Sequence, residues 1–367
     1  MMEAPLKKIS WRMILSALVA IAVSRQAARA DSLIAPFVDA QTSAVVHVDF
    51  SQLDMDQLDA WVQKSIAQIS DATLRAQQQQ NSQKSIDSMR AWINKFKTAG
   101  GKDLYVAISL AGIIQGSPGG MIIPLNGADP APLAKVVNPG GNPPPPDPND
   151  PNAAQQQRMM PQTAVVGNAL VMSTGAGIDK LKTPSSQPRQ DLTDALAAGG
   201  DSTLHLVFTP ASLKDNPLFG AMVMSRFRTS QQQPPFSDAH WDSVTWMSVS
   251  FVAPPKESGN CTIQCKDSDS ATAMADYLNQ QMQDAKNGAT SRPAADADDI
   301  AKLIDAAKPT VSGTQVVVSL DQNTIDNVIG PMLTNQMSHA PAPAPGGPMG
   351  PPPADNGAPT DNSNNGM

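Results

Sequence analysis

Short stretches of alternating apolar and polar residues recur along this chain and predict β-strands. In the first of them, Val46, Val48 and Phe50 alternate with His47 and Asp49. Successive side chains of a strand point to opposite faces of a sheet, so the apolar residues should lie under helices and the polar ones on the other face. The same alternation predicts further strands over residues 103–110, 119–125, 204–209, 244–253 and 259–266.

Apolar residues spaced three and four positions apart predict helices between these strands. The longest helical region follows the first strand and carries Leu58, Trp61, Val62, Ile66, Ile69, Ile86, Met89, Ile93 and Phe96. Tight hairpins are predicted at Gly167 and Gly313, where glycine suits the turn. Shorter helices are predicted near 129–138, 176–182, 268–285, 295–308 and 322–337.

The elements occur twice in the same order, which indicates an internal duplication. Four strand segments have counterparts: 46–51 with 204–209, 104–110 with 245–251, 121–125 with 261–265, and 167–173 with 313–319. Each copy has the order β-α-β-β-α-β-β-α. We therefore expect an α+β protein of two tandem copies, with largely antiparallel sheets and helices on one face.

Differences in amino-acid composition along the chain indicate further segment boundaries. Two stretches rich in Pro, Asn, Gln and Gly lack apolar periodicity and could not recover the entropy lost on ordering, so we expect both to be disordered. The predicted divisions are a signal peptide (1–30), copy 1 (31–183) with a disordered Pro/Gln-rich insert (139–162), a connector (184–200), copy 2 (201–338) and a disordered Pro-rich tail (339–367).

The first 30 residues have the three parts of a secretory signal peptide. Lys7 and Lys8 give a basic start, residues 13–23 are apolar, and Ala28 and Ala30 supply small residues for cleavage. The apolar stretch would rise about 16 Å as a helix, too little to cross a bilayer. We expect cleavage after Ala30 and export to the periplasm or the cell exterior, with no transmembrane anchor left.

The net charge of the chain limits the kinds of partner that we expect it to bind. The full chain has a net charge of −7, and the mature chain would keep 21 of 26 basic residues and 32 of 33 acidic ones. An acidic protein lacks the basic surface that nucleic acid requires, and gains no attraction to anionic lipid. We therefore expect no nucleic-acid partner.

The sequence offers little for metal, cofactor or disulfide chemistry. Cys261 and Cys265 lie four positions apart in one predicted strand, so their Cα atoms would be about 13 Å apart, too far for a disulfide. We expect both to be buried free thiols. The chain has four His, and none has the spacing of a common metal motif. We expect no metal and no cofactor.

One sheet face combines polar and aromatic residues and is the candidate binding surface. It should carry His47, Tyr105 and Ser109 in copy 1, and His205, Trp246 and Ser250 in copy 2. This surface is either a concave binding face, a small Ser/His site, an ordinary half-solvated face, or the seam where the two copies pack.

No nucleophile–base pair, metal set or phosphate loop can be placed, so we expect a binding or assembly module rather than an enzyme. Its partner would be an unidentified macromolecule, and its oligomeric state is open. The alternative is a periplasmic carrier of an apolar small molecule or lipid, held in a cavity lined by Met, Val, Ile and Phe. The third interpretation is a hydrolase that uses His47 or His205 with a neighbouring Ser.

Overall fold

The structure is a computed structural model. The predicted signal peptide, the Pro-rich tail and most of the predicted insert lie outside the residues that it describes. Those described residues are 33–69, 71–110, 112, 119–145, 160–183, 185, 187–211, 238–289 and 294–329.

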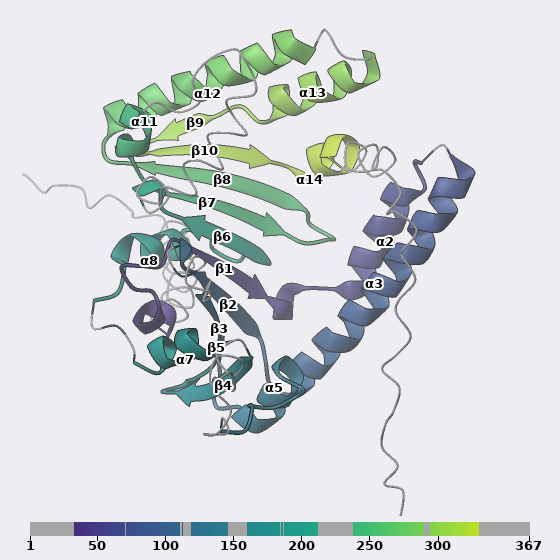
Figure 1. Ribbon diagram of the computed structural model, residues 1–367. Coiled ribbons are helices and arrows are strands. Elements are labelled where there is room, and N and C mark those ends of the chain that lie inside the picture. Colours follow the sequence, from purple (N-terminus) through teal and green to yellow (C-terminus); the bar gives the residue numbers. More distant parts are fainter. Residues whose placement is uncertain are drawn as a thin grey trace, which may run out of the picture.

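Ten strands form one antiparallel sheet in the order β4-β5-β3-β2-β1-β6-β7-β8-β10-β9 (Figure 1). Their bounds follow the alternating stretches and the Gly hairpins closely. They are β1 (Ala44–Asp49), β2 (Asp103–Ile108), β3 (Gly119–Pro124), β4 (Pro161–Val166), β5 (Ala169–Thr174), β6 (Leu204–Phe208), β7 (Val244–Val252), β8 (Ser258–Cys265), β9 (Thr310–Ser312) and β10 (Gln315–Leu320).

The central strands β1 and β6 come from the two halves of the chain and pair antiparallel. Their register places His47 opposite His205, with Ala44 opposite Phe208 at one end and Val48 opposite Leu204 at the other. Outward from this pair the order is β1-β2-β3-β5-β4 on one side and β6-β7-β8-β10-β9 on the other. Both halves therefore belong to a single continuous sheet.

Helices connect the strands and begin at capping residues. Asp54, Asp71 and Asp129 each accept hydrogen bonds from main-chain N–H groups at the start of a helix, which satisfies donors that have no intrahelical partner. The helices are η1 (Ala35–Phe37), η2 (Phe50–Gln52), α2 (Met55–Ile66), α3 (Ala72–Thr98), α5 (Pro130–Val137), α7 (Gly175–Lys182), α8 (Gln190–Ala197), α11 (Asp238–Ser243), α12 (Ser268–Ala289), α13 (Ala294–Ala306), α14 (Gln322–Thr324) and the π-helix η3 (Ile325–Ile329).

Helices cover both faces of the sheet, so the expectation of helices on one face was wrong. The face that bears His47, hereafter the histidine face, packs against η1, α7 and α8. The opposite face packs against α3 and α5 in the first half and against α12 in the second. The physical reason is that the histidine face is itself largely apolar, since Val45, Val207 and Trp246 lie on it and need burial.

Helix α8 lies inside the segment that was predicted to be a connector. Its Leu192, Ala195 and Leu196 are buried against the histidine face. The helix is short, so its apolar periodicity extends over too few residues to distinguish it from a loop.

The two cysteines are free, as predicted. Cys265 is buried and Cys261 is partly buried, and both lie in β8. Burial raises the pKa of both thiols, and Asp267 raises that of Cys265 further. Both side chains contribute to the core beneath α12.

The edge strand β4 is partly closed by an asparagine side chain. Asn142 accepts a hydrogen bond from the Thr163 main-chain N–H (2.7 Å) and donates one to the Thr163 carbonyl (2.9 Å). The amide thus occupies the position that a further strand would take. Edge strands with free main-chain groups are templates for pairing with other chains, so this contact limits association.

Replacing Asn142 by Ala should expose the edge of β4. We expect N142A to lose about 1–2 kcal/mol of stability, because the exposed hydrogen bonds of the Asn142 side chain to Thr163 are removed. We also expect it to associate as protein concentration rises, measured by sedimentation velocity. Gln80→Ala, which removes an exposed amide from α3, is the control. Identical sedimentation of N142A and wild type at every concentration would show that Asn142 does not protect the edge.

Candidate functional site

The six residues predicted to share a face do so, and four of them form a row across the sheet. Tyr105 pairs with His47 across β2 and β1, His47 with His205 across β1 and β6, and His205 with Ser250 across β6 and β7. The row crosses the junction between the two halves.

His47 is held by two neighbours from β2. Its Nε2 lies 3.0 Å from Asp103 Oδ1, and its ring stacks on Tyr105 with centroids 4.3 Å apart. The Asp103 side chain remains partly accessible to solvent. The contact with Asp103 and the stack fix the orientation of the imidazole ring.

His205 lies at the centre of the sheet and is 1 % exposed. It packs beneath the end of α8, where a Cβ added to Gly199 would lie 2.0 Å from His205 Nδ1. Only glycine leaves room for the ring there. Burial, and then the charge of His47, lower the pKa of His205 to about 4, against a Leu196 main-chain hydrogen bond that raises it. His205 is therefore neutral at pH 7, and its Nε2 has no hydrogen-bond partner among the residues that the structure describes.

The other two predicted residues lie apart from this row. Trp246 and Ser109 are each four positions from Ser250 and Tyr105 along their strands, about 13 Å away. Trp246 is buried in the core of the histidine face, and Ser109 lines a pocket. Within the described part of the chain, neither His47 nor His205 has a hydrogen bond to a serine, so this geometry lends no support to a Ser/His hydrolase.

At the centre of the sheet, the face that was expected to be exposed is covered, and the face that was expected to be covered is partly exposed. The row of polar and aromatic residues is covered, with Tyr105 and His205 almost fully buried. By contrast, Leu204, from the set expected under helices, is 42 % exposed. Tyr105 and His205 therefore lie in a packed seam, whereas Ser109 and Trp246 each line a pocket.

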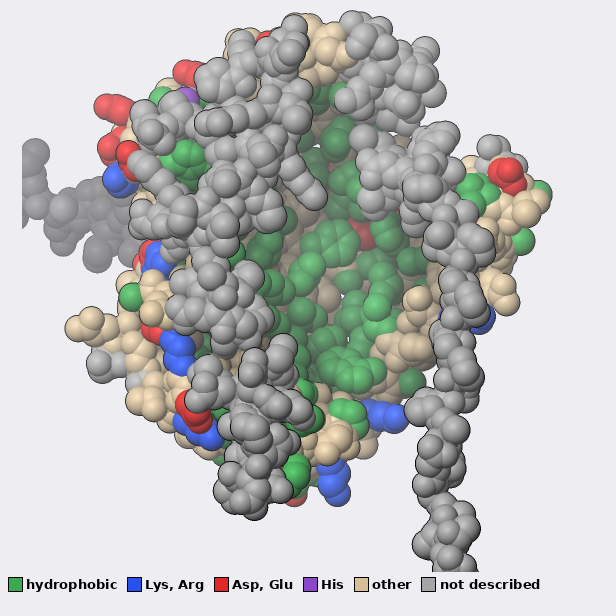
Figure 2. Space-filling model, viewed as in Figure 1, with side chains coloured by type: hydrophobic (Ala, Val, Ile, Leu, Met, Phe, Trp, Pro, Cys, Tyr) green, Lys and Arg blue, Asp and Glu red, His purple; other side chains and the backbone are tan. Residues whose placement is uncertain are grey.

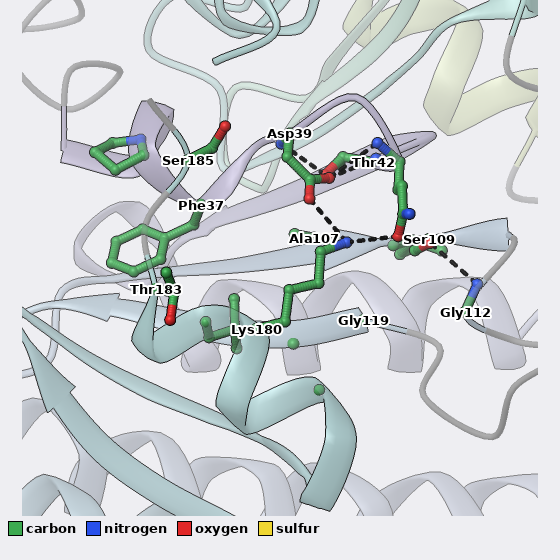
Figure 3. A pocket seen from close by; sticks show the side chains of 16 residues that line it. Phe37, Asp39, Thr42, Ala107, Ser109, Gly112, Gly119, Lys180, Thr183 and Ser185 are labelled. Atoms are coloured by element: carbon green, nitrogen blue, oxygen red, sulfur yellow. Dashed lines mark hydrogen bonds and ion pairs between the residues drawn. The ribbon is translucent and has the colours of Figure 1, made fainter. Parts of the chain in front are cut away.

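One accessible surface is a pocket of about 490 Å³ at the end of the histidine face (Figure 3). It lies between the η1 loop, the ends of β2 and β3, and α7. The sequence indicated Ser109 but not the other polar residues that line the pocket, because those residues come from distant segments of the chain. Its polar side chains belong to Asp39, Gln41, Thr42, Ser109, Lys180, Thr183 and Ser185.

An ion pair crosses this pocket. Lys180 Nζ lies 2.9 Å from Asp39 Oδ2 and donates a hydrogen bond to Gln41 Oε1 at 3.1 Å. The second oxygen of Asp39 accepts hydrogen bonds from main-chain N–H groups of Gln41 and Thr42 and from the Thr42 hydroxyl. Burial alone would raise the pKa of Asp39, but Lys180 and these donors together lower it. The pair is thus ionised at neutral pH.

Two glycines on β3 shape the pocket wall. A Cβ on Gly120 would lie 2.3 Å from Leu181 Cδ1, so glycine allows α7 to approach the sheet closely. Gly119 has a φ of +144°, and a Cβ there would lie 1.8 Å from the Ala107 carbonyl oxygen. Larger residues at either position would displace the wall.

The second accessible surface, the open face, is the central part of the sheet opposite the histidine face. Figure 2 shows it as a hydrophobic hollow. Leu204 and Val249 are 42 % and 45 % exposed. The core beneath α3 includes Val48 and Val106, and that beneath α12 includes Ile263 and Val316, so the uncovered part lies between them. The open face consists of Val46, Leu204, Leu206, Phe208, Val249 and Phe251, with Val48 and Met247 at its borders with the two cores.

Asp326 joins the helices of the two halves at the end of the sheet where β1 and β10 end (Figure 1). Trp61 Nε1 donates a hydrogen bond to Asp326 Oδ1 at 3.1 Å, and Lys64 Nζ lies 3.0 Å from Asp326 Oδ2. Trp61 and Lys64 belong to α2, and Asp326 belongs to η3. The open face is therefore bounded at this end.

Comparison with protein-family models, with curated proteins and with solved structures gave no match to this chain. No three metal-ligating side chains gather anywhere in the residues that the structure describes. Over those same residues, no helix combines the length and the apolarity needed to cross a bilayer. We therefore infer function from the geometry of the pocket and of the open face.

The buried His205 should make stability depend on pH. The unfolded chain binds the proton near pH 6.5 and the folded chain only near pH 4, so stability is complete above about 6.5 and falls as the pH drops toward 4. The full loss is about 3 kcal/mol. Urea unfolding from pH 7.5 to 4.5 would measure it.

His205→Leu should flatten this dependence, because the titrating group is removed and Leu fits a buried site. His240→Gln, which alters another histidine outside the sheet, should retain it. An H205L protein that loses as much stability on acidification as wild type would assign the effect to other groups.

Proposed function

We propose that this chain is a binding protein that holds an uncharged apolar ligand, such as a lipid acyl chain, on its open face. The observation that carries this proposal is the run of apolar side chains on β1, β6 and β7 that no described helix covers, between two helix-covered flanks. Soluble proteins rarely leave contiguous apolar surface uncovered, and such patches mark binding sites. The proposal takes up the alternative expectation, a carrier of an apolar small molecule or lipid, in place of a module with a macromolecular partner.

The chemistry of the open face favours an uncharged ligand. On β1, β6 and β7, every side chain that points to this side is Ala, Val, Leu, Phe or Met. A charged ligand group there would lose its hydration without a partner. The sequence predicted that an apolar ligand would lie in a cavity lined by Met, Val, Ile and Phe. Similar residue types now support binding at an open surface, whereas the lining of the pocket beside Lys180 combines polar, charged and apolar residues.

The width of the open face suits an extended chain. The three central strands span two strand spacings, about 10 Å, which accommodates one acyl chain lying along the strands. Burying the exposed half of a Leu or Val side chain contributes about 1 kcal/mol. Contact with several of these side chains would therefore give useful affinity without any polar contact.

We also propose that the two halves arose by duplication of one α+β unit. The matching strand orders on either side of the β1–β6 pair support this interpretation. So does the position of corresponding helices, since α5 and α12 both follow the third strand of their half and pack on the same face. In this interpretation His47 and His205 are equivalent residues that meet at the junction.

Export is the third part of the proposal. The basic start, the apolar stretch and the small residues at Ala28 and Ala30 support secretion and cleavage after Ala30. A protein that binds apolar ligands outside the cytoplasm would act as a carrier between surfaces.

Binding can be tested with the uncharged fluorophore N-phenyl-1-naphthylamine and the mature full chain. We expect saturable fluorescence enhancement, and we expect Val249→Thr to weaken binding about three- to tenfold, because a hydroxyl replaces a methyl group in the site. Val311→Thr is the matched control, since Val311 is equally exposed, at 45 %, but lies on the edge strand β9.

Absence of saturable binding to wild type would overturn the proposal. Equal affinity in the Val249→Thr and Val311→Thr proteins would place the probe elsewhere. Leu204→Thr offers a second test on the neighbouring strand β6, and unfolding curves of each variant would show that a loss of binding is not a loss of folding.

Cleavage can be tested by intact mass measurement of the protein from an envelope or culture fraction. We expect the mass of Asp31 to Met367. Ala30→Asp should leave the precursor uncleaved, because the position before the cleaved bond requires a small residue. Arg29→Ser changes the intervening position and should be processed normally. A mature protein that retains Met1 would refute the signal peptide.

A further inference from the structure

We propose that the pocket beside Lys180 binds a neutral saccharide or polyol, at a site separate from the open face. The pocket lies against the histidine face, whereas the proposed apolar ligand would lie on the opposite side of the sheet. Its volume of about 490 Å³ falls within the usual range for small-molecule sites.

The ion pair presents a donor and an acceptor next to each other. The ammonium group of Lys180 has three N–H donors; among the described residues only Asp39 and Gln41 accept from it, which leaves one donor. Asp39 Oδ2 accepts from Lys180 and retains acceptor capacity. Adjacent hydroxyls of a sugar offer the complementary arrangement, because each can both accept and donate.

Other side chains extend this pattern. The Ser109 oxygen accepts a hydrogen bond from the Gly112 main-chain N–H at 3.1 Å, and the hydroxyl proton has no acceptor among the described residues. The Gln41 amide gives its oxygen to Lys180, and within the described part of the chain its NH₂ group has no partner. Figure 3 shows Ser109 and Lys180 in this pocket, with the hydrogen bond of Ser109 to Gly112 and the ion pair of Lys180 with Asp39.

The charge balance of the pocket argues for a neutral ligand. Lys180 and Asp39 neutralise one another, and no other charged side chain lines the pocket within the part of the chain that the structure describes. An anion would face Asp39 and a cation would face Lys180, so either would compete against an existing ion pair. A neutral ligand can bind without separating the pair.

An apolar wall completes the fit. Phe37, Ala107 and Leu181 line the pocket on the side of the sheet, and they suit the C–H surface of a sugar ring. The Lys180 and Asp39 side chains are 44 % and 24 % exposed, so a ligand can reach them from solvent.

Saturation-transfer NMR on the mature full chain tests this site with four probes: methyl β-glucopyranoside, N-acetylglucosamine, acetate and glycine. We expect transfer to one or both saccharides, with dissociation constants in the millimolar range, and none to acetate or glycine. Lys180→Met should weaken saccharide binding at least tenfold, and Ser109→Ala should weaken it severalfold. Lys182→Met changes a neighbouring lysine that does not line the pocket and should bind as wild type does.

Absence of transfer to both saccharides, or preferential binding of acetate or glycine, would overturn the proposal. So would unchanged saccharide binding in Lys180→Met. If Lys180→Met does not fold, Ser109→Ala and Gln41→Leu carry the test. Retention of naphthylamine binding by Lys180→Met, and of saccharide binding by Val249→Thr, would show that the two sites are separate, so one proposal can fail without the other.

Discussion

The pairing of β1 with β6 is the interaction on which the rest of this structure depends. It joins two five-stranded arrays into one ten-stranded sheet, and its register brings His47 and His205 together. Without this pair each half would present a central strand edge to solvent. Covering the pair on one side with α8 buries His205, which is why a polar residue lies almost fully buried at the centre of the sheet.

The same arrangement explains why both accessible surfaces lie away from the histidines. Helix α8 covers the junction on the histidine face and leaves the pocket beside Lys180 at one end. On the opposite face α3 and α12 lie over the outer parts of the two halves, and the central strands between them stay uncovered. The two surfaces thus differ in chemistry because different helices border them.

Much of the sheet followed from the sequence, since alternation and hairpin glycines such as Gly167 and Gly313 located its strands. Alternation also sorted His47 and Tyr105 onto one face correctly. It could not say which face is covered, because Val45 and Trp246 make the histidine face apolar too. The pocket was beyond prediction, since its lining comes from segments that meet only after α7 docks against β3.

An open sheet has no intrinsic stopping point, because each outer strand could pair with a further strand. In this protein one end is capped by Asn142, which occupies the main-chain groups of Thr163, and the other end is the three-residue strand β9. These two features act as terminators. They limit the pairing of the outer strands with strands of other chains, so a side chain outside either proposed binding surface helps to keep the sheet at ten strands.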